Sequence, residues 1–115
     1  MRIKLLQNLN NSLHGIAYCW EEHSFRVEVY ALVLGLGVVV FLDRPLWASV
    51  LAIGSILLVM MAEALNTAIE RLCDRITLAQ DPQINVVKDV ASAGVFLSVL
   101  IAGLVWIWFL VAALR

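Results

Sequence analysis

Three long apolar stretches dominate the pattern of hydrophobic and polar positions along the chain. They cover residues 25–42, 46–62 and 90–114, and short polar connections separate them. At about 1.5 Å per residue, helices over these stretches would measure about 27, 26 and 37 Å, close to the roughly 30 Å of a bilayer's hydrocarbon core. Because the stretches are continuous and do not alternate, they predict transmembrane helices and not the strands of a barrel.

We expect these transmembrane helices at about 25–42, 46–70 and 88–114, so that the second continues past its apolar part. The triplet Asp43-Arg44-Pro45 predicts a tight turn between the first two helices, since proline suits a first helical turn. The polar stretch from Ala79 to Gln83 predicts a break in the chain before the third helix.

The N-terminal segment, from about residue 3 to residue 22, has a different pattern. Apolar residues recur there at helical spacing, with polar residues between them. This pattern predicts an amphipathic helix that lies along the membrane interface or packs on the helix bundle, and the two readings are compatible. The apolar positions are Ile3, Leu6, Leu9, Leu13, Ile16 and Trp20.

The composition also indicates a membrane protein. Of the 115 residues, 63% are hydrophobic and 15% are charged, and the mean hydropathy is +0.92. A soluble domain of this size could not bury so much apolar surface, so we expect a single all-α membrane domain over residues 1–115. The net charge of −1 gives no sign of nucleic-acid binding. Cys19 and Cys73 fit no metal-binding spacing.

Lys and Arg are distributed unevenly over the two ends of the expected bundle. Six lie at the end that carries the N-terminus, and two lie at the other end. The excess of positive charge places the N-terminus and the connection around residues 71–88 in the cytoplasm. The six are Arg2, Lys4, Arg26, Arg71, Arg75 and Lys88, and the two are Arg44 and Arg115.

Acidic residues follow the second apolar stretch directly. Glu63, Asn66, Glu70 and Asp74 fall within roughly 80° of one another on a helix, so they share one stripe, from which Arg71 should point away. Polar residues are expected where a helix leaves the membrane. An acid near the bilayer, however, costs up to about 2.5–3.5 kcal/mol and is usually paired or functional. The stripe is therefore a candidate site.

Two further polar groups are expected at the same cytoplasmic level. Carboxylates that converge there would repel one another unless a cation neutralised them, and oxygen ligands without a His or Cys cluster suit Mg²⁺ with substrate phosphates. A lysine in one group could contact a phosphate. The sequence has no GxxxxGK loop and no soluble-kinase motif set. The two groups are Glu21, Glu22 and Glu28, and Lys88, Asp89 and Ser92.

The segment Glu63-Ala-Leu-Asn66-Thr-Ala-Ile-Glu70 resembles the signature Glu-x-Leu-Asn-Ser/Thr-Ala-Ile/Val-Glu of the bacterial integral-membrane diacylglycerol kinase family, which includes undecaprenol kinases. Glu22, three residues before Phe25, and the pair Lys88-Asp89 support the resemblance, which extends to about Trp106. It implies a homotrimer of three-span subunits with an N-terminal surface helix in the bacterial inner membrane. It also implies Mg²⁺-dependent transfer of the γ-phosphate of ATP to a lipid hydroxyl on the cytoplasmic side.

The resemblance also implies roles for individual residues. Glu63 matches the catalytic base, and Glu22 and Glu70 match the metal-binding carboxylates. Before the first span the chain is one residue shorter than the family pattern, which leaves Glu21 as the alternative to Glu22. The positions that match nucleotide-binding residues are Asn66, Asp74, Ala79, Gln80, Asp81, Lys88 and Asp89, and those that match lipid-binding residues are Arg26, Glu28, Ser92 and Trp106.

Three functions remain open at this point. Arg26-Val27-Glu28 and Leu58-Val59-Met60 resemble the diacylglycerol-directed branch of the family, whose product is phosphatidate. The alternative is an undecaprenol kinase, and that branch often has His at the position of Glu28. A third hypothesis is a non-enzymatic, cation-binding membrane oligomer, whose acids would be spread through the membrane's depth and not gathered at one end.

Overall fold

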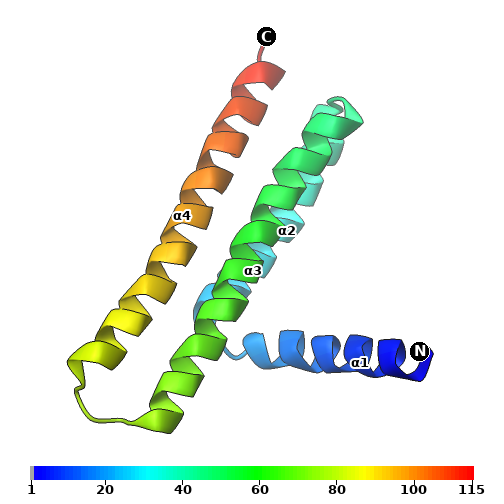
Figure 1. Cartoon of the computed structure of the whole chain (residues 1–115). Helices are drawn as coiled ribbons and strands as arrows, with labels where there is room; N and C mark the ends of the chain where they lie inside the picture. Colours follow the sequence, from blue (N-terminus) through cyan, green and yellow to red (C-terminus); the bar gives the residue numbers. More distant parts are fainter. Residues whose placement is uncertain (1) are drawn as a thin grey trace.

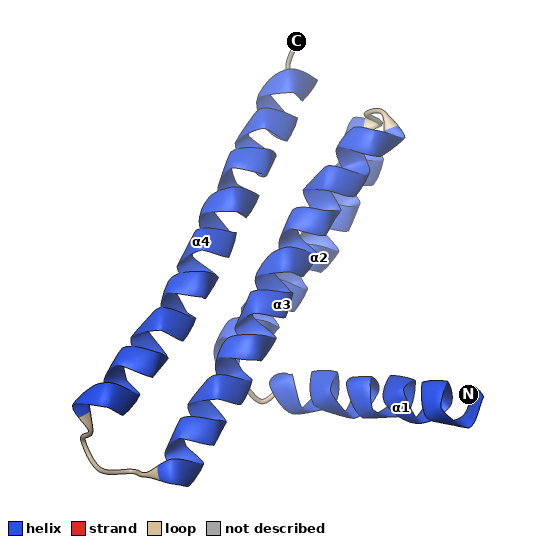
Figure 2. Cartoon of the chain, viewed as in Figure 1, coloured by secondary structure: helices blue, strands red, loops and turns tan. Residues whose placement is uncertain are grey.

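Four helices make up the computed structural model, which describes the backbone of residues 2–115 and the side chains of residues 3–115. The helices are α1 (Arg2–Cys19), α2 (His23–Leu42), α3 (Leu46–Ile76) and α4 (Pro82–Ala113). In this described part of the chain, Figure 2 shows helices joined by loops and no strand. The prediction of an all-α fold is therefore confirmed.

The central helix is α3, because it packs against α2 along one side and against α4 along another. The shorter α1 contacts α3 near one end of the bundle and lies across it there (Figure 1). The C-terminus of the chain lies at the opposite end of the bundle from α1. The long connection between α3 and α4 is at the α1 end, and the short turn between α2 and α3 is at the C-terminal end.

α2, α3 and α4 are each long and apolar enough to cross a membrane. The most apolar windows of these helices are only 11%, 28% and 11% buried inside the chain. Apolar surface exposed on this scale needs lipid or other protein around it. The expected three spans agree with this finding, and the chain is a membrane protein.

The observed helix ends differ in three places from the ranges that hydrophobicity predicts. α1 ends at Cys19 and not near residue 22, and α3 continues to Ile76, past residue 70. α4 begins at Pro82, before the expected residue 88. Asp81 explains this early start, because its Oδ1 accepts hydrogen bonds from the backbone N–H groups of the residues two and three positions later, at 2.9 and 3.3 Å. Proline at the first helical position adds to the cap.

The turn between α2 and α3 lies where the polar triplet predicts it. Asp43 ends α2 in the left-handed backbone conformation, with φ of 49° and ψ of 49°, a conformation that Asp tolerates better than most residues. Pro45 then precedes the first residue of α3 in an extended conformation. This turn needs no glycine, and it brings α3 back against α2.

The best-packed part of the bundle lies toward the C-terminal end. Ala48, Ala52 and Phe109 are completely buried there. The indole Nε1 of Trp106 donates a 3.0 Å hydrogen bond to the carbonyl of Ala52. Gly35 lets α2 lie close to α4, because a Cβ atom at this position would be only 3.1 Å from the Trp106 ring. Small residues at such contacts let membrane helices pack closely.

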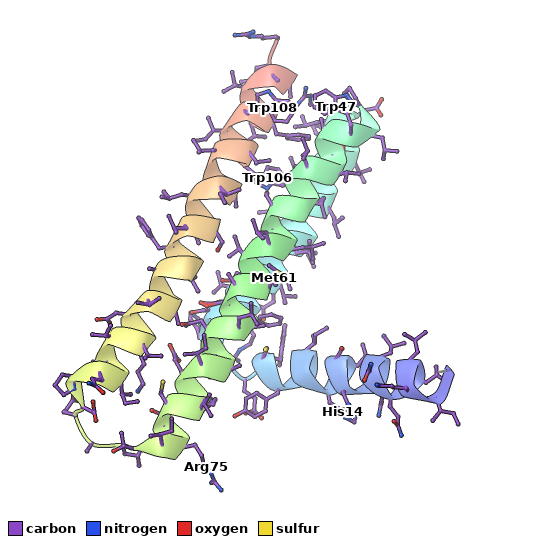
Figure 3. The ribbon with its side chains drawn as sticks, viewed as in Figure 1. His14, Trp47, Met61, Arg75, Trp106 and Trp108 are labelled. Carbon is purple, nitrogen blue, oxygen red and sulfur yellow. The ribbon has the colours of Figure 1, made fainter. Side chains whose placement is uncertain are left out.

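Arg44 closes the same end of the bundle. Its guanidinium donates a 3.1 Å hydrogen bond to the carbonyl of Phe109, in the last turns of α4, and lies 5.2 Å from the ring centre of Trp108. Trp47 stacks against Trp108 with ring centres 5.5 Å apart, and Figure 3 shows both tryptophans near the C-terminal end. A cation near a helix C-terminus is favourable, and tryptophans are typical of membrane–water boundaries.

Candidate functional site

The acidic residues gather at the opposite end of the bundle, where α3 extends beyond its apolar part. Asn66 and Glu70 lie one turn apart on α3, and the Asn66 Nδ2 donates a 3.0 Å hydrogen bond to the Glu70 Oε1. The Oδ1 atom of Asn66 is buried and has no hydrogen-bond partner among the described residues. Asn66 and Glu70 therefore lie next to each other on one face of α3, as the stripe predicts, and the Asn66 amide orients the Glu70 carboxylate.

Glu63 is the centre of the acidic group. It is partly buried, and its carboxylate is close enough to those of Glu22 and Glu70 for mutual electrostatic repulsion. Glu28 on α2 interacts with Glu63 in the same way, and the Glu28 Oε1 is buried without a hydrogen-bond partner among the described residues. Carboxylates from the α1–α2 connection, α2 and α3 thus approach one another, as the sequence predicts.

Glu22 has a partner that the sequence did not predict. Its Oε1 lies 2.6 Å from a guanidinium nitrogen of Arg71, and that guanidinium also lies 5.6 Å from the ring centre of Tyr18 on α1. Arg71 therefore points off the stripe toward the α1–α2 connection, where it meets a carboxylate of the site. Helical spacing could not reveal the contact, because Arg71 meets a part of the chain that lies 49 positions earlier in the sequence.

The expected nucleotide-binding residues other than Asn66 lie where α3 and α4 approach the connecting loop. Lys88 on α4 forms a 2.8 Å ion pair with Asp74 on α3. In the loop, the backbone N–H of Ala79 bonds to the Thr77 hydroxyl. Gln80 accepts a 3.2 Å hydrogen bond from the Asn85 side chain, and Asp81 caps α4. Asp89 is exposed on the first part of α4.

The four expected lipid-binding residues do not form one group. Arg26 and Glu28 lie in the first two turns of α2, next to the acidic group, and Ser92 is exposed on α4. Trp106 lies away from this group. Its indole bonds to the backbone of Ala52, which is roughly 16 Å along α3 from Glu63. Its indole is used in packing near the C-terminal end, far from the carboxylates.

An apolar groove adjoins the acidic group. It has a volume of about 620 Å³ and lies between α1, the start of α2 and the middle of α3. Leu57, Met60 and Met61 line it along α3, and Tyr18 and Arg71 lie at its polar end. A groove with apolar walls and a polar end suits an amphipathic molecule.

The two cysteines take no part in the acidic group. Both Cys19 and Cys73 are buried and free. Burial raises the pKa of the Cys19 thiol above its ordinary value, and the nearby Glu22 carboxylate raises it further. Cys19 is therefore a neutral thiol at physiological pH, which makes it a poor nucleophile and a poor metal ligand.

The donor atoms of the site suit a hard cation. All of them are carboxylate or amide oxygens, which are the ligands that Mg²⁺ prefers. Within residues 3–115, no three His, Cys, Asp or Glu side chains are grouped closely enough to surround one ion. Mg²⁺ commonly takes one or two protein carboxylates and completes its shell with phosphate and water, so Glu22 and Glu70 would be enough to hold this ion without a third acid.

Comparison with known proteins agrees with the signature on α3. The sequence profile of the prokaryotic diacylglycerol kinase family matches residues 10–110. A diacylglycerol kinase of Escherichia coli (strain K12) is 33% identical over 104 residues, which are 90% of this chain and 85% of the relative. The diacylglycerol kinase of Haemophilus influenzae is 34% identical over 103 residues, covering 89% of this chain and 87% of the relative. The chain therefore belongs to the prokaryotic diacylglycerol kinase family.

Proposed function

We propose that the protein is a lipid kinase that transfers the γ-phosphate of Mg-ATP to diacylglycerol and produces phosphatidate. Membership of the family and the names of its relatives support the reaction class. The observation that carries the proposal is the position of Glu63, at the centre of the carboxylates and at the end of a membrane-length apolar helix. The only free hydroxyl of a diacylglycerol lies at a similar depth, near the membrane–water boundary.

Glu63 is the general base in this proposal. The lipid hydroxyl oxygen attacks the γ-phosphorus, its O–H bond breaks, and its proton passes to the Glu63 carboxylate. The bond between the γ-phosphorus and the bridging oxygen breaks at the same time, and ADP leaves with that electron pair. A positioned base contributes about 10²–10⁴-fold to such a step.

Glu22 and Glu70 are the proposed ligands of the cation. The Asn66 amide orients Glu70 through a 3.0 Å hydrogen bond. A bound Mg²⁺ supplies positive charge that offsets the charge developing on the phosphate oxygens. Among the described residues, Arg71 bonds to one oxygen of Glu22, and the other oxygen is left for the cation.

The nucleotide lies, in this proposal, at the α3–α4 end of the site. Lys88 exchanges Asp74 for a phosphate oxygen when ATP binds, which is possible because both side chains of the pair are partly exposed. Residues 79–81 and Asp89 contact the rest of the nucleotide. With the nucleotide held at the loop between α3 and α4, its γ-phosphate would face the carboxylates on α3.

The groove between α1 and α3 receives an acyl chain of the lipid. Its walls are apolar, so burial of the chain contributes about 0.8 kcal/mol per methylene. Arg26, Glu28 and Ser92 are the proposed contacts of the lipid's polar part. Trp106 is too far along the bundle to reach that part, and we assign it to the far end of the lipid path.

We further propose that the site faces the cytoplasm and that the protein is a homotrimer. Arg44 and Arg115 belong to the C-terminal end, while the other described Lys and Arg side chains belong to the end that carries α1. The excess of positive charge favours a cytoplasmic position for the α1 end. α1 would then lie along the interface, and copies of the chain would cover part of the exposed apolar surface of α4.

Transfer of label from γ-³²P-ATP tests the proposed reaction. The purified protein is incubated in mixed micelles with Mg²⁺ and either diacylglycerol or undecaprenol. We expect labelled phosphatidate and little labelled undecaprenyl phosphate. Transfer of label to undecaprenol alone would show that undecaprenol, and not diacylglycerol, is the substrate. Transfer to neither lipid would favour the non-enzymatic cation-binding oligomer.

A further inference from the structure

Arg71 joins three parts of the chain at the edge of the acidic group. It extends from α3, forms an ion pair with Glu22 at 2.6 Å, and lies over the ring of Tyr18 at the end of α1. Its neighbour in sequence, Glu70, belongs to the acidic stripe. The guanidinium therefore supplies positive charge to the carboxylate group from the side where α1 turns into α2.

Glu22 is free to exchange this partner. It occupies the N-cap position of α2, but its side chain makes no capping hydrogen bond there. The Glu22 and Arg71 side chains remain 34% and 52% exposed. Ion pairs with this exposure are weak and easily rearranged. A divalent cation, which carries twice the charge of a guanidinium, can therefore displace Arg71 from the Glu22 carboxylate.

We propose that Arg71 is a positioning residue that holds Glu22 at the site before the cation arrives and then competes with the cation for it. Arg71 thereby sets the divalent-ion concentration at which the site fills. The inference rests on the proposed function, since it takes Glu22 as a cation ligand. Arg71 lies outside the acidic stripe. Its charge lowers the affinity of the site for the cation, while its contacts keep Glu22 and Tyr18 in place.

Mn²⁺ binding measured by electron paramagnetic resonance tests this competition without using turnover. Free Mn²⁺ is titrated into the purified protein in detergent, with and without a non-hydrolysable ATP analogue. Arg71→Gln removes the charge and keeps a similar size, and we expect it to lower the Kd for Mn²⁺ by about three- to tenfold. Arg71→Lys keeps the charge and should stay within about twofold of the wild type.

Arg75→Gln is the matched control. Arg75 lies one turn further along α3, loses the same charge on substitution, and points away from the bundle in Figure 3. It should leave the Kd within about twofold of the wild type, because an exposed charge at greater distance is screened by salt. An equal effect of both Gln variants would show a general charge effect and would overturn the proposal.

The Glu22→Gln background separates this inference from the proposed function. In that background Arg71→Gln should no longer change the Kd, because the shared carboxylate is gone. If Glu22→Gln weakens Mn²⁺ binding but Arg71→Gln raises the Kd or leaves it unchanged, the competition is wrong and the metal assignment stands. If Glu22→Gln binds Mn²⁺ like the wild type, the metal assignment of Glu22 fails and the competition fails with it.

Hydrogen exchange gives a second measurement that needs no bound ion. The backbone N–H groups of Glu21 and Glu22 bond to the carbonyls of Tyr18 and Cys19, so they report on the connection that Arg71 holds. We expect faster exchange of these amides in Arg71→Gln than in Arg75→Gln. Unchanged exchange would show that Arg71 does not position the connection.

Discussion

A single amide illustrates how the site is built at the scale of residues. Asn66 donates through Nδ2 to the carboxylate that follows it by one turn, and this bond leaves its Oδ1 buried and unpaired. A buried oxygen without a partner is costly unless a ligand satisfies it. Local spacing on α3 was enough to predict that Asn66 and Glu70 are neighbours, since i and i+4 positions on a helix lie side by side. It did not predict the hydrogen bond or the buried oxygen.

Glu63→Gln tests the proposed base. The variant keeps the size of the side chain but cannot accept the proton, so kcat should fall by about 10²-fold or more while helix content is unchanged. Glu21→Gln is the control, because Glu21 is exposed and the proposed site uses Glu22 in its place. Its rate should stay near that of the wild type. Wild-type turnover in Glu63→Gln would remove Glu63 from the chemistry.

The partner of Glu22 shows where residue-level prediction stops. Periodicity identified the carboxylates, because those on α3 repeat at helical spacing within one segment. It could not identify Arg71 as their neighbour, because that contact depends on how α1 and α2 are placed against α3. Nor could periodicity reveal that the Trp106 indole bonds to the backbone of α3, because that contact also depends on how two helices pack.

At the scale of elements, hydrophobicity predicted where the helices are but not where each one begins and ends. The apolar stretches correspond to the parts of α2, α3 and α4 that are long enough to span a bilayer. The first turns of α4 mix polar and apolar residues and were missed, because a side-chain cap and not apolar periodicity starts that helix. α3 ends beyond the membrane-length segment, because backbone hydrogen bonding continues a helix where lipid contact stops.

Asp81→Ala tests the cap that starts α4. Loss of the two hydrogen bonds to the Gln83 and Ile84 amides should destabilise the first turn by about 0.5–2 kcal/mol. Hydrogen exchange at these two amides should become faster, whereas the amides of the apolar part of α4 should keep their protection. Equal exchange in the variant and the wild type would show that the cap does not hold the turn.

Gly35→Val tests the contact between α2 and the α3–α4 pair. A side chain at this position meets Ile56 at 2.9 Å and Trp106 at 3.1 Å, so we expect a loss of about 1–3 kcal/mol from overpacking. Gly37→Val is the control on the same helix, because a Cβ at Gly37 meets nothing within 4 Å. Thermal unfolding in one detergent should give a lower Tm for Gly35→Val. Equal values of Tm would contradict the close approach.

At the scale of the whole molecule, the chain buries little of its own apolar surface. Only about a tenth of the apolar window of α4 is buried, and large side chains such as Phe96 and Leu104 are exposed along that helix. Lipid can cover such a surface, but a second copy can also provide the close packing that one chain lacks. The carboxylates of the site come from different helices, so helix–helix assembly and site formation depend on the same contacts.

Native mass spectrometry tests the proposed assembly. Protein released gently from detergent should give a complex of three chains, because a trimer covers more of α4 than a monomer does. Substitution of an exposed apolar residue on α4 by a charged one, for example Leu104→Glu, should shift the distribution toward single chains. The same substitution at Leu5 on α1, which is also exposed, is the control. Single chains in the wild type would contradict the trimer.

The most direct measurement is electron–nuclear double resonance on Mn²⁺ bound together with a non-hydrolysable ATP analogue, in protein whose glutamate side chains carry ¹³C carboxylates. We predict hyperfine coupling of the ion to nucleotide ³¹P and to glutamate ¹³C, with the ¹³C signal reduced in Glu70→Gln and in Glu22→Gln. Coupling to phosphorus alone in the wild type, or a ¹³C signal that neither substitution changes, would contradict a cation site built from these carboxylates.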